Sequence, residues 1–120
     1  MITEDYVSFK TAKLLKEKNF FSINCYTAYD ENGDFFWYGD YSKDRRDIID
    51  APTLQMVMKW LRDTHGLFIH IDVIREASCW LADIQDIKGD VSIYPVKKEF
   101  PNYEEACETA IRYCLENLIN

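Results

Sequence analysis

The sequence predicts an α+β fold: an antiparallel sheet of about five strands with three helices, in the order α-β-β-α-β-β-β-α, in a single domain over residues 1–120. Two observations lead to this prediction. Short turn signals separate several apolar segments, and strands joined by hairpins are antiparallel neighbours. Three other segments repeat apolar residues at helical spacing, so we expect helices that cover one face of the sheet.

The first two helices are predicted from their capping residues. The first follows Ser8, runs to about Lys18 and stops at Asn19, a residue that tolerates left-handed backbone. The second follows Thr53 and ends at Gly66. Its apolar spacing predicts a buried face made of four residues: Leu54, Val57, Trp60 and Leu61.

The third helix is predicted from Asn102 to about Ile119. Small and apolar residues recur on one stripe of it: Tyr103, Cys107, Ala110, Ile111, Cys114 and Leu118. The charged residues lie off that stripe. This arrangement is typical of a helix that packs against a core, and it does not indicate a particular reaction.

The strands are predicted from apolar runs between turns. Segments 22–29 and 35–38 flank Asp30–Asp34, in which Asn32-Gly33 supplies the positive φ angles of a hairpin turn. The polar segment 39–51 is expected to be an irregular connection. Three further strands are predicted at 67–74, 78–87 and 90–96, and Pro95 places the last of them at a sheet edge.

The charge balance narrows the classes of partner. The formal net charge is −7, and residues 61–120 hold eleven acidic and six basic residues against ten and eight in residues 1–60. An acidic chain of this kind is not expected to bind nucleic acid broadly or to bind an anionic membrane. An acidic surface that meets a basic partner remains compatible with it.

Compartment and redox state follow from the N-terminus and the cysteines. The opening Met1–Asp5 is acidic rather than basic and apolar, and no apolar run is long enough to span a bilayer, so a cytoplasmic protein is expected. Four cysteines, Cys25, Cys79, Cys107 and Cys114, lie in apolar segments without close ligand spacing. We expect reduced, buried thiols, no metal and no cofactor.

Catalytic groups are few. His70 and Asp72 share one face of the predicted 67–74 strand. If the following turn pairs Val73 with Cys79, the thiol faces away from the imidazole, which removes the nearest candidate for a Cys-His nucleophile. The acidic turn at residues 30–34 lacks the glycine and glutamate positions of an EF-hand loop, so a plain hairpin is the better interpretation.

Residues 35–46 have the strongest binding character. Alternation along a strand places Phe35 with Trp37 and Phe36 with Tyr38, and one pair is expected near the surface. Aromatic and arginine side chains together are typical of interface hot spots, and they also suit stacking on single-stranded bases. The alternative is that the segment folds back over these aromatics as a second layer. The predicted binding residues are Trp37, Tyr38, Tyr41, Arg45 and Arg46.

Several stretches resemble a group of small uncharacterised proteins from gut-bacterial genomes and their phages or mobile elements. They are Tyr6–Phe9, Ala12–Lys18, Ala51–Met56, Lys59–Arg62, Tyr103–Cys107 and Tyr113–Ile119. The resemblance covers most of the chain. It implies a small cytoplasmic accessory protein, often phage-associated, and implies no activity, ligand or catalytic residue.

Three functional hypotheses follow. The first is a noncatalytic accessory protein that binds another protein or a second copy of itself. The second is an acidic mimic of nucleic acid that blocks a DNA-binding protein, which requires the carboxylates to form one dense surface. The third is a small enzyme with a site near His70 and Asp72.

Overall fold

The computed structural model describes residues 2–20, 25–37, 48–87 and 93–119. These residues form two compact units, Met1–Thr53 and Leu54–Asn120, which are described separately. They contain three α-helices and two three-stranded antiparallel sheets, so the α+β class is confirmed. The expected sheet of about five strands is instead two sheets with six strands in all. The assignment of residues 1–120 to a single domain stays a prediction.

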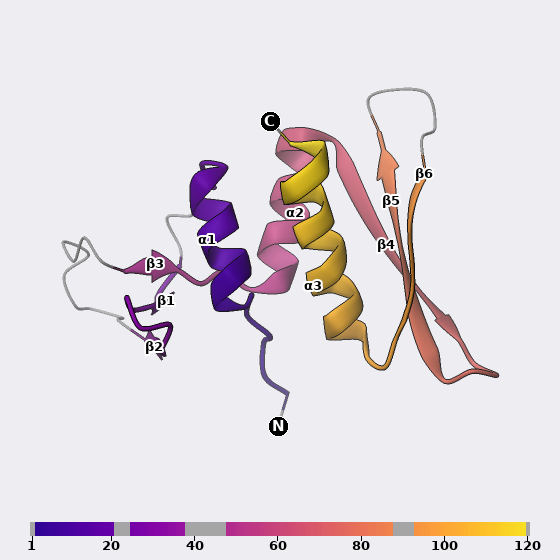
Figure 1. The fold of residues 1–120 in the computed structure, drawn as a ribbon, viewed down its shortest axis with the longest axis horizontal. Helices are drawn as coiled ribbons and strands as arrows, with labels where there is room; N and C mark the ends of the chain where they lie inside the picture. Colours follow the sequence, from indigo (N-terminus) through magenta and orange to yellow (C-terminus); the bar gives the residue numbers. More distant parts are fainter. Residues whose placement is uncertain (1, 21–24, 38–47, 88–92, 120) are drawn as a thin grey trace. The chain divides into compact units, whose positions relative to one another are not determined.

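In the first unit, helix α1 (Phe9–Glu17) begins and ends as its capping residues predict (Figure 1). The Ser8 hydroxyl accepts a hydrogen bond from the Thr11 N–H at 3.2 Å, which satisfies one of the free donors of the first turn. Asn19 adopts φ 64°, the left-handed conformation that ends a helix. Val7, just before the cap, and Ala12, in the next turn, are both buried.

The sheet of the first unit has the order β2-β1-β3, with β1 at Thr27–Tyr29, β2 at Phe35–Trp37 and β3 at Ile49–Asp50. The prediction of an irregular connection over 39–51 is wrong at its end, because β3 pairs with β1 there. Two residues are too few for alternation to be visible in the sequence. The predicted strand 22–29 appears only as its last three residues within the described part of the chain.

The β1–β2 hairpin depends on Gly33, which adopts φ 83°. The Gly33 N–H donates to the Asp30 carbonyl at 3.0 Å, and the Asp30 carboxylate accepts from the N–H groups of Asn32 and Asp34, both at 2.9 Å. The hairpin is confirmed, but only the glycine takes a positive φ, not both residues of Asn32-Gly33. The acidic side chain of Asp30 therefore organises the turn itself, as Asx turns do.

The core of the first unit contains buried apolar residues and a pair of hydrogen bonds between Thr27 and Ala51. Leu15, Ala28 and Ala51 are essentially inaccessible to solvent. The buried Thr27 hydroxyl donates to the Ala51 carbonyl at 2.6 Å, and the Ala51 N–H returns a bond to the Thr27 carbonyl at 2.9 Å. The hydrogen bond offsets the cost of removing the Thr27 hydroxyl from water.

In the second unit, α2 (Leu54–His65) ends before Gly66, whose φ of 67° confirms the predicted helix stop. Leu54, Val57 and Leu61 are buried, as the spacing predicts. Trp60 is only half-buried, so its assignment to the buried face needs correction. Its ring packs edge-on against His65, with ring centroids 4.7 Å apart, along the margin of the apolar stripe.

The second sheet has the order β4-β5-β6, with strands Leu67–Ile74, Cys79–Asp86 and Ile93–Phe100. Helices α2 and α3 lie side by side along one face of it, and the β4–β5 hairpin extends beyond them (Figure 1). Strand β6 is an edge strand, as Pro95 predicts, and it ends later than expected, at Phe100. The predicted start at residue 90 lies outside the described residues. A register shift opposite Trp80–Ala82 interrupts its pairing with β5.

The last helix, α3, spans Tyr103–Tyr113 and is capped by Asn102, whose side chain accepts from the Glu105 N–H at 2.8 Å. It continues as a π-helix over Cys114–Leu118. The wider turn changes which residues face the core: Leu115 and Ile119 are buried, whereas Leu118, predicted on the stripe, is half-buried. Hydrogen bonding from i to i+5 shifts the face that an α-helical period predicts.

Candidate functional site: an exposed aromatic cluster

Five aromatic side chains of the first unit pack into one group, here called the aromatic cluster: Tyr6, Phe9, Tyr29, Phe35 and Trp37. Neighbouring ring centroids are 5.0–6.0 Å apart, and the rings are tilted or edge-on rather than stacked. These are the separations and orientations that aromatic pairs prefer. The cluster therefore holds its members in fixed positions relative to one another.

The position of each ring follows from the local fold. The β1–β2 register pairs Tyr29 with Phe35 and Thr27 with Trp37, so alternation places Tyr29, Phe35 and Trp37 on one face of the sheet. Tyr6 comes from the segment before α1, and Phe9 is the first residue of α1. Tyr6 is anchored there by its β-bridge to Thr53, beside the bond from the Val7 N–H to the Pro52 carbonyl (3.0 Å).

One end of the cluster is tied to the core and the other is exposed. The Tyr29 hydroxyl donates to the Val7 carbonyl at 2.5 Å, and the Lys13 ammonium lies 4.7 Å from the centre of the Phe9 ring. At the other end, Phe35 is 40% exposed and Trp37 is 63% exposed. A large aromatic ring that is fixed on one side and open on the other offers apolar contact area at little entropic cost.

The structure places one of the predicted binding residues. Trp37 is exposed at the surface, and Phe35 shares its face, while Phe36 is half-buried. Tyr38, Tyr41, Arg45 and Arg46 lie outside the described residues. Sequence reasoning missed Tyr6, which precedes the first helix and gives no signal of pairing with β2. The bridge from Tyr6 to Thr53 is a long-range contact that local periodicity does not encode.

The group around His70 has a different arrangement from the one expected. The register pairs Ile74, not Val73, with Cys79, so the thiol shares a face with His70 and Asp72. The residue opposite His70 is Asp83, which is four residues, or about 13 Å, along the strand from Cys79. A thiol at that distance is out of hydrogen-bond reach of the imidazole, and the Asp72 carboxylate instead accepts from the Val73 N–H at 3.0 Å.

The four cysteine thiols are buried, as their apolar surroundings predict, and none of them forms a disulfide. Burial raises the pKa of the Cys114 thiol to about 12, and burial, helped by the charge of Glu99, raises the pKa of Cys79. Thiols of this kind are poor nucleophiles at neutral pH. Among the described residues, no group of three or more His, Cys, Asp or Glu side chains is arranged to hold a metal ion.

A small pocket lies between α1 and β3 in the first unit. Its volume is about 120 Å³, and its described lining consists of Ala12, Leu15, Lys16, Phe20, Ile49 and Asp50. Sites for drug-sized ligands are larger, about 300–1,000 Å³. The pocket is therefore a weaker candidate than the aromatic cluster.

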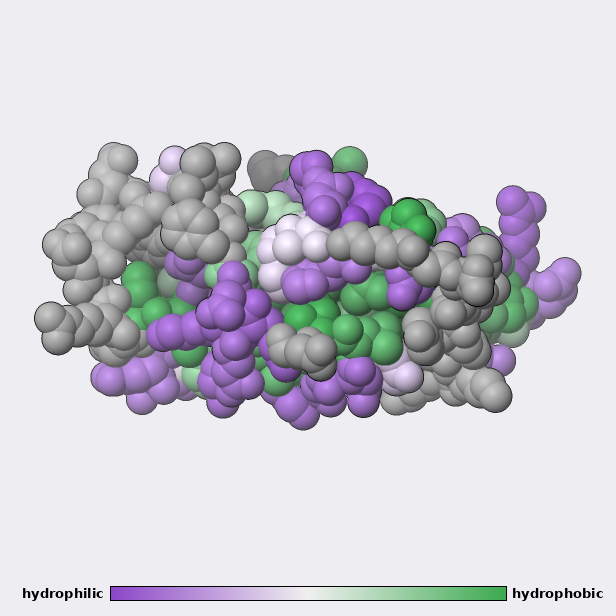
Figure 2. Space-filling model, turned by 90° about the horizontal axis from the view of Figure 1, so that it is seen from above, coloured by the Kyte–Doolittle hydropathy of each residue, from purple (hydrophilic) through white to green (hydrophobic). Residues whose placement is uncertain are grey.

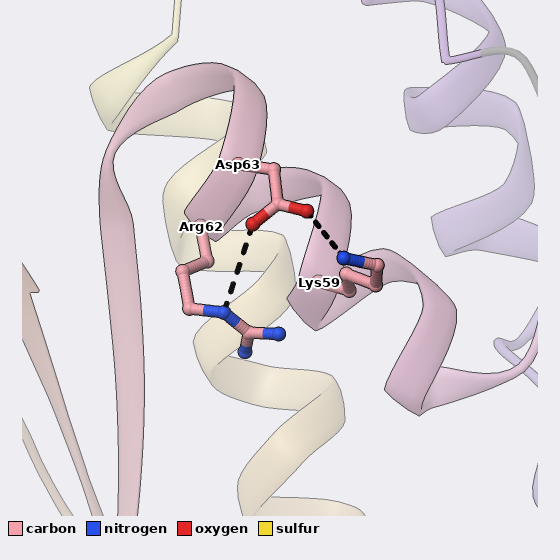
Figure 3. Close-up of polar contacts among 3 residues, drawn as sticks. All are labelled: Lys59, Arg62 and Asp63. Atoms are coloured by element: carbon pink, nitrogen blue, oxygen red, sulfur yellow. Dashed lines mark hydrogen bonds and ion pairs between the residues drawn. The ribbon is translucent and has the colours of Figure 1, made fainter.

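The charged surfaces of the second unit mix both signs. On α2, the Asp63 carboxylate pairs with Lys59 at 2.5 Å and lies 3.9 Å from Arg62 (Figure 3). The hydrogen bond from Lys59 is the main cause that lowers the pKa of Asp63. On α3, Glu104, Glu108 and Arg112 follow one another at four-residue spacing, so both signs of charge share one row. The Arg112 Nε atom is buried without a hydrogen-bond partner in the described structure.

The surface also mixes hydrophobic and hydrophilic residues, which show side by side in the space-filling view (Figure 2). No helix in the described ranges combines the length and the apolar character that crossing a membrane requires.

In comparisons with known proteins, no family model matches the chain, and no curated protein or solved structure matches it significantly.

Proposed function

We propose that this protein is a noncatalytic accessory protein that acts by binding another protein, with Trp37 at the centre of its contact surface. The observation that supports this most directly is that Trp37 is 63% exposed while its ring meets Tyr6 edge-on at 6.0 Å. The phage or mobile-element context, and a cytoplasmic location, belong to this proposal through the resemblance described above.

The physical argument is preorganisation. Binding immobilises side chains at an interface, and this costs free energy for each flexible group that is ordered. Trp37 and Phe35 are already held by rings behind them, so less entropy remains to be lost when a partner covers them. Tryptophan and tyrosine are also the residues that dominate measured binding hot spots.

The sequence after Trp37 extends the proposed surface. Tyr38, Tyr41, Arg45 and Arg46 follow it directly in the chain. Arginine would supply paired N–H donors for carboxylates of the partner at the margin of an aromatic centre. In this proposal the partner contributes an apolar side chain opposite Trp37 and acidic groups around it.

The test uses Trp37→Ala, alone and combined with Arg46→Ala, on the full chain. We expect the midpoint of thermal unfolding to change by only a few degrees, about the effect of a surface substitution. We expect the variants to lose the protein partners that the wild type captures from a bacterial lysate. Tyr26→Ala is a matched control, because Tyr26 is an aromatic residue of the same unit that is 48% exposed outside the cluster.

Two results would contradict the proposal. If Trp37→Ala unfolds the protein, the ring is a structural element and the exposed surface has been misjudged. If the variant stays folded and its associations match those of the wild type and of Tyr26→Ala, the protein does not bind through this surface.

A further inference from the structure

The two edges of the β4-β5-β6 sheet differ in how they are protected. An edge strand has a row of backbone groups that can pair with another chain, and proteins commonly block it with proline, lysine or an irregular register. Strand β6 has two of these features: Pro95, which lacks an N–H, and the register shift against β5. Strand β4 has eight residues in continuous register with β5 and none of these features.

The outer edge of β4 has no strand partner among the described residues. Three of its residues are exposed: His70, Asp72 and Val73, the last at 42%. Val73 lies near the turn of the β4–β5 hairpin, where it pairs with Trp80. An exposed, unblocked strand with a β-branched residue at its open end is suited to accept a further strand.

The order of residues along β4 identifies the strand that fits. Two copies of β4 can pair antiparallel about a two-fold axis that passes through Ile71. In this register, the numbers of two residues that lie opposite each other add up to 142. His70 then lies opposite Asp72 of the second copy, and Asp72 opposite its His70. Ile69 meets Val73, Phe68 meets Ile74, and Ile71 meets itself. Opposite charges and apolar residues directly across a strand pair both stabilise it.

We propose that β4 is a self-association surface, on which a second copy of the chain adds its own β4 in this register. The two three-stranded sheets would then form one continuous sheet across the dimer axis. The pairing covers the exposed Val73 and places opposite charges at both His70–Asp72 positions. This surface is separate from the aromatic cluster and does not depend on the function proposed for Trp37.

The neighbouring registers are less favourable, which makes the choice of register specific. A shift of the axis to His70 places the two imidazoles opposite each other, and a shift to Asp72 does the same for the two carboxylates. Like charges directly opposite destabilise a strand pair. Moving the axis by one residue in this way shifts the strand register by two residues. A register shift of a single residue would place side chains of opposite faces across from each other and is excluded by the pleat.

Charge exchange tests the register. In His70→Asp, the altered residue meets Asp72 of the second copy at both ends, so we expect dimerisation to weaken about tenfold in sedimentation equilibrium. In the double variant His70→Asp/Asp72→His the opposite charges are restored in exchanged positions, and we expect dimerisation to recover. The measurements are made near pH 6, within the range in which histidine gains its charge.

The double variant also controls for an effect inside one chain. On its own face His70 is met by Asp83, directly across on β5, and by Asp72, two residues along β4. His70→Asp therefore adds repulsion against Asp83 in both the single and the double variant. A difference between the two in dimerisation reports the contact between copies, and circular dichroism confirms that each variant is folded.

A second pair of variants tests the edge itself. Val73→Lys adds a charge at the open end of β4 and should abolish dimerisation, whereas Ile87→Lys changes an exposed apolar residue (58%) just after β5 and should not. Concentrations centred on about 100 µM are appropriate, because a single strand pair buries little area and binds weakly. The wild type remaining monomeric there, or a dimer that is unaffected by Val73→Lys, overturns the proposal. A dimer lost in Trp37→Ala but kept in Val73→Lys would assign self-association to the aromatic cluster instead.

Discussion

Replacement of Gly33 by alanine links the turn, the helix and the aromatic cluster in one measurement. Gly33 has φ 83°, a conformation that costs an L-residue about 1–2 kcal/mol relative to glycine. A Cβ atom at this position would also lie 3.0 Å from Cδ2 and 3.2 Å from Cε2 of the Phe9 ring. Both effects act against the folded state.

The two contributions can be estimated separately. Overpacking a site that cannot give way costs about 1–3 kcal/mol, and the Phe9 ring is limited in how far it can move because Tyr29 and Lys13 contact it. We therefore expect Gly33→Ala to lower the free energy of unfolding by about 2–5 kcal/mol, the sum of the two contributions. Chemical denaturation followed by circular dichroism measures this change.

A double-mutant cycle separates the clash from the backbone strain. Phe9→Ala removes the ring that the new Cβ would meet, so Gly33→Ala should cost about 1–2 kcal/mol in that background, the value for the backbone alone. The reasoning is refuted if Gly33→Ala changes stability by less than about 0.5 kcal/mol. If Gly33→Ala lowers the free energy of unfolding equally with and without the Phe9 ring, backbone strain explains the whole effect and the contact with Phe9 contributes nothing.

Two further predictions concern the second unit. Leu61→Ala should destabilise the protein by about 2–5 kcal/mol and Trp60→Ala by less, because Leu61 is fully buried and Trp60 only half-buried; the reverse ranking in denaturant unfolding would contradict the packing described for α2. The pKa of Cys114 is raised by burial to about 12 in the folded state, so its stabilising contribution is present at neutral pH and is lost as pH rises from about 9 towards 12. Between about pH 9 and 12, the free energy of unfolding should decline less steeply for Cys114→Ala than for the wild type. Parallel declines of the two proteins would show that the Cys114 thiol is not the group responsible.

Local signals in the sequence were sufficient for the ends of α1 and α2, the start of α3 and the β1–β2 turn. Ser8, Asn102 and Gly66 act at positions where a cap or a left-handed residue is needed, and each requirement involves only neighbours in the chain. The long strands β4 and β5 were predicted within one or two residues, because alternation over eight residues is visible in the sequence.

The candidate site could be predicted only in part. The surplus of aromatic residues at 35–37 indicated that some ring would remain near the surface, and Trp37 does. Which pair would be exposed, and which rings would support it, depended on Tyr6, whose bridge to Thr53 joins segments 47 residues apart in the sequence. The periodicity of apolar residues gives no information about contacts between residues so far apart in the sequence.

The sequence by itself determined the class of fold, the ends of α1 and α2, the β1–β2 hairpin and the burial of the cysteines, because these follow from backbone preferences and from the spacing of apolar residues. Tertiary structure alone decided that the strands form two sheets, that β3 exists, and that Cys79 pairs with Ile74 rather than Val73. A one-residue difference in a turn moves every following side chain to the other face of a sheet. The face that presents His70, Asp72 and Cys79 was thus set by strand pairing, which no local pattern specifies.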